Sequence, residues 1–203
     1  MLEYRIKARF YFQQHDASAH ENIWRWGFAT DAGSGEYDVP QCNRSTTPPS
    51  ECVHAISAHL KVSDFSDMGA TSCNLRNVWN GLAPACFKGG KNASVGFKPV
   101  YVGAHCHAPA CISEELYNAD TGELICRNVP TYGTMAGGAN GTHRFEEKGY
   151  LALPPCVWGD PALGLTEPPL LRWETNLLSI KKVNSTYAHT GEMALWQGRG
   201  ILV

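Results

Sequence analysis

The sequence predicts an all-β protein, a two-sheet antiparallel sandwich with long disulfide-tied loops. Polar and apolar residues alternate over several short segments, and turn residues recur between these segments. The sequence contains no convincing amphipathic helix longer than about two turns. With 203 residues the chain is long enough for one well-filled domain, so we expect a single domain over 1–203.

The first half of the chain predicts three strands. Residues 2–13 alternate with a period of two and carry a charged outer face, which is typical of a strand at the edge of a sheet. Residues 22–30 place aromatic side chains at alternate positions, and residues 52–62 alternate again. The range 31–96 is rich in Cys, Gly and Pro, so we expect a loop insertion there. The N-terminal run has no apolar signal-peptide core, from which we expect that Met1 is not the native start.

The second half predicts extended segments separated by loops rich in Gly, Pro and Asn. The predicted segments are residues 95–107, a hairpin over 112–129 with its turn at 118–122, and residues 150–158, 177–183 and 193–197.

Charge and hydropathy exclude two classes of partner. The formal net charge is −2 and the sequence pI is about 6.4, so the chain offers no basic field for nucleic acid or anionic membranes. No stretch approaches the roughly 20 apolar residues that span a bilayer. We therefore expect neither a nucleic-acid partner nor a membrane span.

Eight cysteines are scattered through the chain, and none forms a Cys-x-x-Cys pair. An even number in Pro- and Gly-rich sequence predicts disulfides in an oxidising compartment rather than a zinc ribbon. Cys42 with Cys52, and Cys73 with Cys86, are close enough in sequence to close loops. The cysteines are Cys42, Cys52, Cys73, Cys86, Cys106, Cys111, Cys126 and Cys156.

Four acceptor sequons for N-linked glycans agree with export through the secretory pathway. Together with the cysteines they predict a glycoprotein that is secreted or lies in the lumen of the pathway. The acceptor residues are Asn43, Asn92, Asn140 and Asn184.

The most informative motif is His105-Cys-His107, because alternate residues of an extended segment point to the same side. Two imidazoles can then share one ion. Met193, near the end of the chain, can add a thioether, and this soft set suits Cu(I) and tolerates Cu(II). Zinc would be expected to recruit a third His, a Cys or a carboxylate instead. The competing interpretation is a solvated histidine pair with Met193 in the core.

These residues resemble the C-terminal catalytic domain of the copper type II, ascorbate-dependent monooxygenases, the family of peptidylglycine α-hydroxylating monooxygenase and dopamine β-monooxygenase. The matching features are the His105/His107 segment, the hairpin after it, the segment 149–156, and the run from 184 to Met193. The resemblance covers roughly the second half of the chain. It implies an eight- or nine-stranded jelly roll, copper held by His105, His107 and Met193, and ascorbate as reductant.

The chain also departs from that family. The family's enzymes carry a second, three-histidine copper site in a preceding domain, for which we find no counterpart here. They place a cysteine after the ligand methionine, whereas this chain has Ala194. Cys156 must then pair elsewhere, with Cys106, Cys111 or Cys126.

Other polar and aromatic residues have simpler interpretations. Glu114 and Glu115 show no partner pattern for paired acid–base catalysis, so we expect them to be solvated. Cys106 lies between the two histidines and points away from them, which favours a disulfide over a thiolate ligand. We expect the tryptophans, including Trp26 and Trp196, to lie in the core.

Two functions fit the sequence. The first is a copper-binding domain, part of an oxygen-activating monooxygenase with a small-molecule or peptide substrate. The second is a non-catalytic extracellular module of a surface coat, an adhesion system or a filament, which self-associates by edge-strand addition.

Overall fold

Antiparallel strands form nearly all the regular structure of the computed structural model, which describes residues 14, 23–29, 36–62, 95–132 and 151–203. Within these ranges the helical segments are two 3₁₀ turns, η1 (Pro49–Glu51) and η5 (Pro161–Leu163). The prediction of an all-β protein is therefore confirmed.

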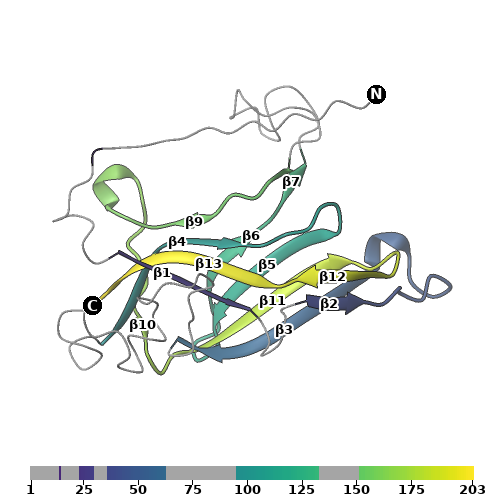
Figure 1. Cartoon of the computed structure of the whole chain (residues 1–203), viewed down its shortest axis with the longest axis horizontal. Coiled ribbons are helices and arrows are strands. Elements are labelled where there is room, and N and C mark those ends of the chain that lie inside the picture. Colours follow the sequence, from purple (N-terminus) through teal and green to yellow (C-terminus); the bar gives the residue numbers. More distant parts are fainter. Residues whose placement is uncertain (1–13, 15–22, 30–35, 63–94, 133–150) are drawn as a thin grey trace.

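Two larger sheets build the molecule (Figure 1). The five-stranded sheet has the order β1 (Ile23–Ala29), β13 (Leu195–Leu202), β4 (Gly96–Ala104) and β10 (Leu171–Arg172), with β9 (Cys156–Val157) also paired to β4. The four-stranded sheet has the order β3 (Val53–Lys61), β11 (Asn176–Asn184), β5 (Cys111–Asn118) and β6 (Glu123–Asn128). Together these two sheets contain nine of the strands in the described part of the chain.

Two small ribbons extend the sandwich. One pairs β12 (His189–Met193) with β2 (Glu36–Val39), and the other pairs β7 (Thr131–Tyr132) with β8 (Leu151–Ala152).

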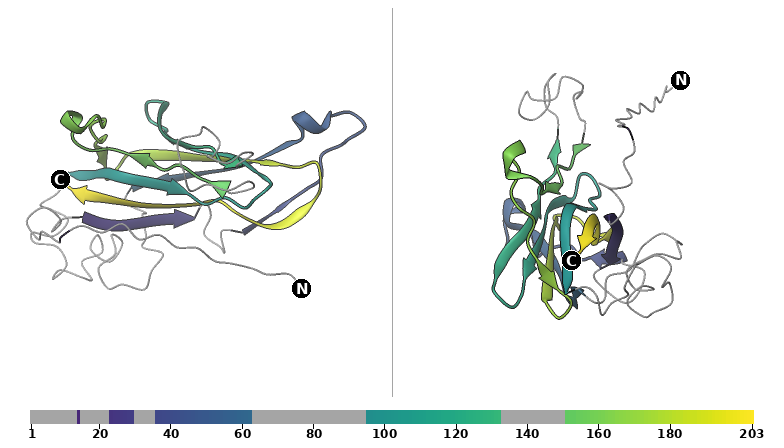
Figure 2. Two further views of the ribbon diagram at one scale, coloured as in Figure 1. Left: turned by 90° about the horizontal axis from the view of Figure 1, so that it is seen from above. Right: turned by 90° about the vertical axis from the view of Figure 1, so that its left-hand side faces the viewer.

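The core lies between the two larger sheets, which form the two layers seen in Figure 2. Trp26 and Phe97 meet edge to face, with 5.5 Å between their ring centroids. Trp196 of β13 donates its indole N–H to Ser179 of β11 at 2.8 Å, so a hydrogen bond joins the layers inside the core. Trp26 and Trp196 are both buried, as predicted.

The predicted hairpin over 112–129 is confirmed by β5 and β6. Its turn is closed by the Gly122 amide, which donates to the Asn118 carbonyl at 2.8 Å, and the Asn118 side chain accepts from the Asp120 amide at 3.0 Å. Gly122 has φ of 75°, a left-handed conformation that glycine adopts without a Cβ penalty. The turn residues thus determine where the hairpin reverses.

The range 31–96 contributes to the sandwich as well as to loops. Its segment β3 pairs along its whole length with β11, and its burial alternates as the sequence predicts. β2 also belongs to this range and pairs with β12. Residues 63–94 lie outside the described part of the chain, as do the predicted strand 2–13 and the glycine-rich loop after residue 132.

The end of the chain differs from the prediction of one strand over 193–197. β12 ends at Met193 and β13 begins at Leu195, so the chain changes sheet at Ala194. β13 then continues to Leu202 between β1 and β4, at the centre of its sheet. This change of sheet brings Met193 to the end of β4.

Candidate functional site

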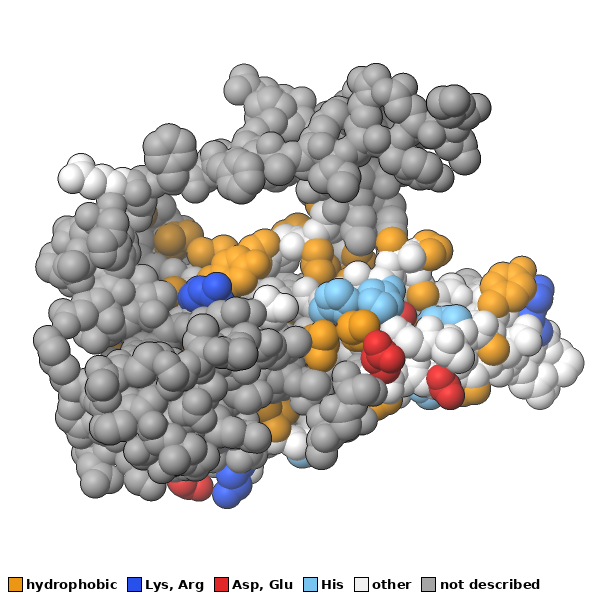
Figure 3. All heavy atoms as spheres, viewed as in Figure 1, with side chains coloured by type: hydrophobic (Ala, Val, Ile, Leu, Met, Phe, Trp, Pro, Cys, Tyr) orange, Lys and Arg blue, Asp and Glu red, His pale blue; other side chains and the backbone are white. Residues whose placement is uncertain are grey.

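His105 and His107 lie just beyond β4 rather than on it, which corrects the prediction of a strand over the whole segment 95–107. β4 ends at Ala104, because the chain turns after the histidines to enter β5. The two rings nevertheless lie together, with 4.8 Å between their centroids and an angle of 77° between their planes. Both side chains are half-buried, and Figure 3 shows adjoining histidine side chains beside apolar and acidic groups on one face.

Three contacts hold this segment in place. The Ala104 amide donates to the side-chain oxygen of the buried Asn128 at 2.6 Å. The His105 amide donates to the Leu195 carbonyl at 2.9 Å, which continues the β4–β13 pairing by one residue. Cys106, between the two histidines, forms a disulfide with Cys111 at the start of β5. The two imidazoles are therefore carried on a segment tied to both sheets.

His105 has an environment that favours its neutral form. Burial lowers the pKa of its imidazole, His107 and Lys181 lower it further, and Glu192 opposes them. Its Nε2 atom is buried and has no hydrogen-bond partner among the described residues. Buried ring nitrogens are nearly always satisfied, so an orphaned one in a neutral imidazole is a candidate ligand atom.

Met193, the third candidate ligand, ends β12 and is half-buried. Its carbonyl and the carbonyl of His105 both accept hydrogen bonds from the ammonium group of Lys181. The backbones of His105 and Met193 therefore meet at one side chain, although the two residues are distant in sequence. On the other side of β12, Met193 pairs with Glu36 of β2.

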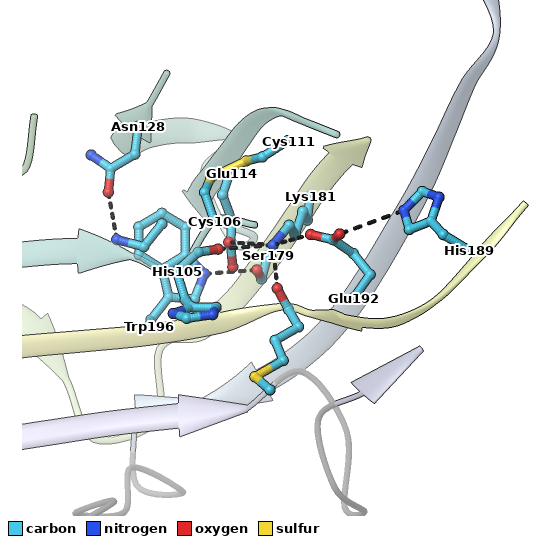
Figure 4. Close-up of polar contacts among 12 residues, drawn as sticks. His105, Cys106, Cys111, Glu114, Asn128, Ser179, Lys181, His189, Glu192 and Trp196 are labelled. Atoms are coloured by element: carbon cyan, nitrogen blue, oxygen red, sulfur yellow. Dashed lines mark hydrogen bonds and ion pairs between the residues drawn. A yellow bond between two sulfur atoms is a disulfide. The ribbon is translucent and has the colours of Figure 1, made fainter. Parts of the chain in front are cut away.

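A buried cluster of charged groups lies at this junction, shown in Figure 4. Lys181 Nζ lies 2.7 Å from Glu192 Oε1 and 3.9 Å from Glu114 Oε2. His189 Nε2 lies 3.6 Å from the other oxygen of Glu192. Glu114, Lys181 and Glu192 are at most 1% exposed, so no bulk water screens their charges.

This cluster overturns the prediction that Glu114 and Glu115 are solvated. Glu114 is fully buried on the core side of β5, and Glu115 is buried on the outer side between Tyr117, Lys182 and Arg127. The prediction was wrong because each carboxylate finds a lysine on the neighbouring strand β11, a pairing that no local pattern reveals. The sequence gives no local sign that Lys181 faces the core, because the apolar residues Leu178 and Ile180 lie on the opposite face of β11.

The donor set at this junction fits a soft metal better than zinc. Within the described ranges, no three His, Cys, Asp or Glu side chains are grouped so as to hold an ion. Two imidazoles and one thioether are a different set, of the kind that suits Cu(I). By donor type, this set is compatible with the copper that the sequence suggests.

The described residues contain three disulfides. Cys42 pairs with Cys52 as expected, Cys106 pairs with Cys111, and Cys126 is the partner of Cys156 among the three that the sequence left open. Cys73 and Cys86 lie outside the described residues. Of the four sequons, Asn43 and Asn184 are described and exposed, whereas Asn92 and Asn140 are not described.

Asn43 and Asn184 lie at the same end of the sandwich. The Cys42 amide donates to the Ser185 carbonyl at 2.9 Å, and the Ser185 amide donates to the Cys52 carbonyl at the same distance. The Asn43 side chain accepts from the Ser45 amide at 3.1 Å, and the Asn184 side chain accepts from the Thr186 amide at 2.9 Å. Both sequons thus form turns at the surface.

In the portion of the chain that the structure covers, no helix has the length and apolar character needed to cross a membrane. Comparisons with models of known protein families, with curated proteins and with solved structures find no match to this chain.

Proposed function

We propose that this chain binds one copper ion through His105, His107 and Met193. The observation that carries the proposal is the buried Nε2 atom of His105, which has no hydrogen-bond partner among the described residues, in a ring whose centroid lies 4.8 Å from that of His107. The Lys181 ammonium group contacts the backbone carbonyls of both His105 and Met193, which brings these two backbone segments close together. This proximity supports the proposal that the Met193 thioether joins the two imidazoles.

The electrostatics of His105 support this proposal. A metal binds the neutral imidazole, and a lowered pKa keeps His105 neutral at pH values where an ordinary histidine begins to gain a proton. The buried cluster beside it contains two carboxyl groups and one ammonium group. Burial raises the pKa of the Glu114 carboxyl, so a cation bound nearby would favour the ionised form of this group.

Copper at such a site would supply one-electron and dioxygen chemistry, with ascorbate as the proposed reductant and a small molecule or peptide as the proposed substrate. The chain's own residues would hold and orient the ion. Turnover by a coupled hydroxylase would also require a second electron-supplying site from another domain or protein. Copper binding is therefore the core of the proposal, and monooxygenase activity is its extension.

We further propose that the protein is a secreted or lumenal glycoprotein. Three disulfides among the described residues fit an oxidising compartment. Asn43 and Asn184 are exposed in surface turns, where the glycan-transferring enzyme can reach their side-chain amides. Asn92 and Asn140 are proposed as acceptors from their sequons.

Metal analysis tests the copper proposal directly. Protein purified without added copper is titrated anaerobically with Cu(I), and the bound metal is measured by mass spectrometry. We expect one copper per chain and loss of that copper in His107→Ala. The matched control is His59→Ala, because His59 is an exposed histidine on β3. Equal copper content in both variants would refute the assignment.

A non-catalytic assembly role is the alternative, and the position of β3 favours it. β3 is the outer strand of the four-stranded sheet and extends from Val53 to Lys61, which is long enough to pair with a strand of another molecule. Sedimentation velocity at increasing concentration tests this role. Self-association that Ser57→Lys abolishes would support it, because an added charge on an outer strand opposes pairing.

A further inference from the structure

Lys181 occupies a core-facing position of β11. Burial along β11 alternates, and the core-facing positions are Leu177, Ser179, Lys181 and Val183. The side chain of Lys181 is fully buried. A buried ammonium group is unfavourable unless its protons are bonded and its charge is balanced, so its contacts indicate what it does there.

The contacts of Lys181 join two separate segments. Its Nζ donates to the His105 carbonyl at 2.8 Å, just beyond β4, and to the Met193 carbonyl at the end of β12. Its third strong contact is the ion pair with Glu192 at 2.7 Å. The ammonium group thus makes two hydrogen bonds to backbone carbonyls and one short ion pair.

No ladder between β4 and β12 holds these segments together. β12 pairs with β2, whereas β4 belongs to the five-stranded sheet. The nearest backbone link is the bond from the His105 amide to Leu195, beyond the change of sheet at Ala194. Figure 4 shows Lys181 between His105 and Glu192, reaching across from β11.

We propose that Lys181 is a positioning residue of the copper site, whose ammonium group sets the spacing between His105 and Met193. This inference rests on the proposed copper function. Lys181 contacts the backbones that carry the ligands and leaves the ligand side chains free. Its removal should therefore separate the thioether from the imidazoles while both histidines remain.

The known energetics of buried ion pairs suggest that Lys181 serves the geometry of the site rather than the stability of the fold. Replacing a buried ion pair by apolar groups of similar volume is often neutral or stabilising, whereas removing one partner alone is strongly destabilising. A double variant that removes both charges is therefore expected to fold. Lys181→Met with Glu192→Gln removes the ammonium group together with its closest carboxylate, and burial favours the neutral form of the Glu114 carboxyl that remains.

The test compares this double variant with two controls. Glu192→Gln alone retains both carbonyl bonds of Lys181, and the Glu114 carboxyl remains beside its ammonium group. Lys182→Met removes the neighbouring lysine, which faces Glu115 on the outer side of the sheet. Each protein is loaded with Cu(I), its affinity is measured by competition, and sulfur coordination is measured by X-ray absorption.

We expect the double variant to bind copper about tenfold or more weakly and to lose the copper–sulfur signal, while both controls retain the signal. A purely structural role would lower the melting temperature without changing the ligand set. A copper–sulfur signal and an affinity that match the wild type in the double variant would overturn the inference.

Amide hydrogen exchange on metal-free protein separates this inference from the copper proposal. We expect faster exchange at the His105 amide in the double variant than in either control, because the ammonium group no longer supports its bond to Leu195. If the wild-type protein binds no copper, the proposed function fails, and with it the role of Lys181 at a copper site. The exchange rates then decide whether Lys181 joins the two segments, and unchanged rates refute that as well.

Discussion

Glu114 and Glu115 are neighbours on β5 with opposite electrostatic surroundings. Burial raises the pKa of Glu114 well above its usual range and Glu192 adds to this, while Lys181 opposes it. Burial also acts to raise the pKa of Glu115, but the Tyr117 hydroxyl at 2.8 Å, Lys182 and Arg127 outweigh it, so the net shift is downward. The pKa values of these two adjacent carboxyl groups are thus shifted in opposite directions.

Substitution of these two residues should change the pH dependence of stability with opposite sign. The folded-state pKa of Glu115 is below its unfolded value of about 4.5, so its stabilisation is present above that pH and is lost as the pH falls through the folded pKa. Glu115→Gln should lower the unfolding free energy by about 1–3 kcal/mol at pH 7 and by less near pH 3.

Glu114 has a raised folded-state pKa, so its contribution is greatest below about pH 4.5 and is lost as the pH rises through the folded value. The unfolding free energy of Glu114→Gln, relative to that of the wild type, should therefore be higher at pH 8 than at pH 4. Urea unfolding curves from pH 3 to pH 8 measure both variants. If the unfolding free energy of a variant changes with pH in the same way as that of the wild type, the pKa shift assigned to the substituted residue is contradicted.

At the scale of single elements, the position of β13 depends on packing that sequence patterns do not predict. Gly198 and Gly200 weaken the strand signal of this segment, yet β13 lies at the centre of its sheet. The large rings of Trp26 and Phe97 occupy the space beside these glycines. Local propensity predicts neither this packing nor the change of sheet at Ala194, because both depend on residues distant in sequence.

Gly200→Ala should destabilise the protein by about 1–3 kcal/mol, because the new methyl group would overlap the fully buried ring of Phe97. The matched control is Gly103→Ala on β4, where the added Cβ would lie 3.0 Å from the hydroxyl of Tyr101. Tyr101 is exposed and can rotate away. Thermal unfolding of both variants measures the difference, and equal melting temperatures would show that the ring of Phe97 moves freely.

At the scale of the whole molecule, the sequence predicted the class of the fold better than the surroundings of the site. Alternation and turn residues indicated β3, β11 and the β5–β6 hairpin, because those signals are local. The histidine pair was visible for the same reason. The charged cluster of Glu114, Lys181 and Glu192 was missed, because it forms only when β5, β11 and β12 are brought together.

The Cys126–Cys156 disulfide is a whole-molecule feature, because it joins β6 of one sheet to β9 of the other. It spans a sequence separation of 30, for which loss of the cross-link is expected to lower stability by about 3–4 kcal/mol. The double variant Cys126→Ala with Cys156→Ala tests this by urea unfolding. The shorter Cys42–Cys52 cross-link, with a separation of 10, provides the comparison and should contribute about 1 kcal/mol less.

The Cys106–Cys111 disulfide has a consequence for the order in which disulfide formation and the proposed metal binding take place. While this bond is open, the chain carries a thiol at Cys106, which lies between His105 and His107 in the sequence. A thiolate is a stronger donor to Cu(I) than a thioether. If the chain binds copper as proposed, metal that arrives before oxidation would meet a thiol that competes with Met193. The Cys106–Cys111 disulfide is then expected to form before the metal is delivered.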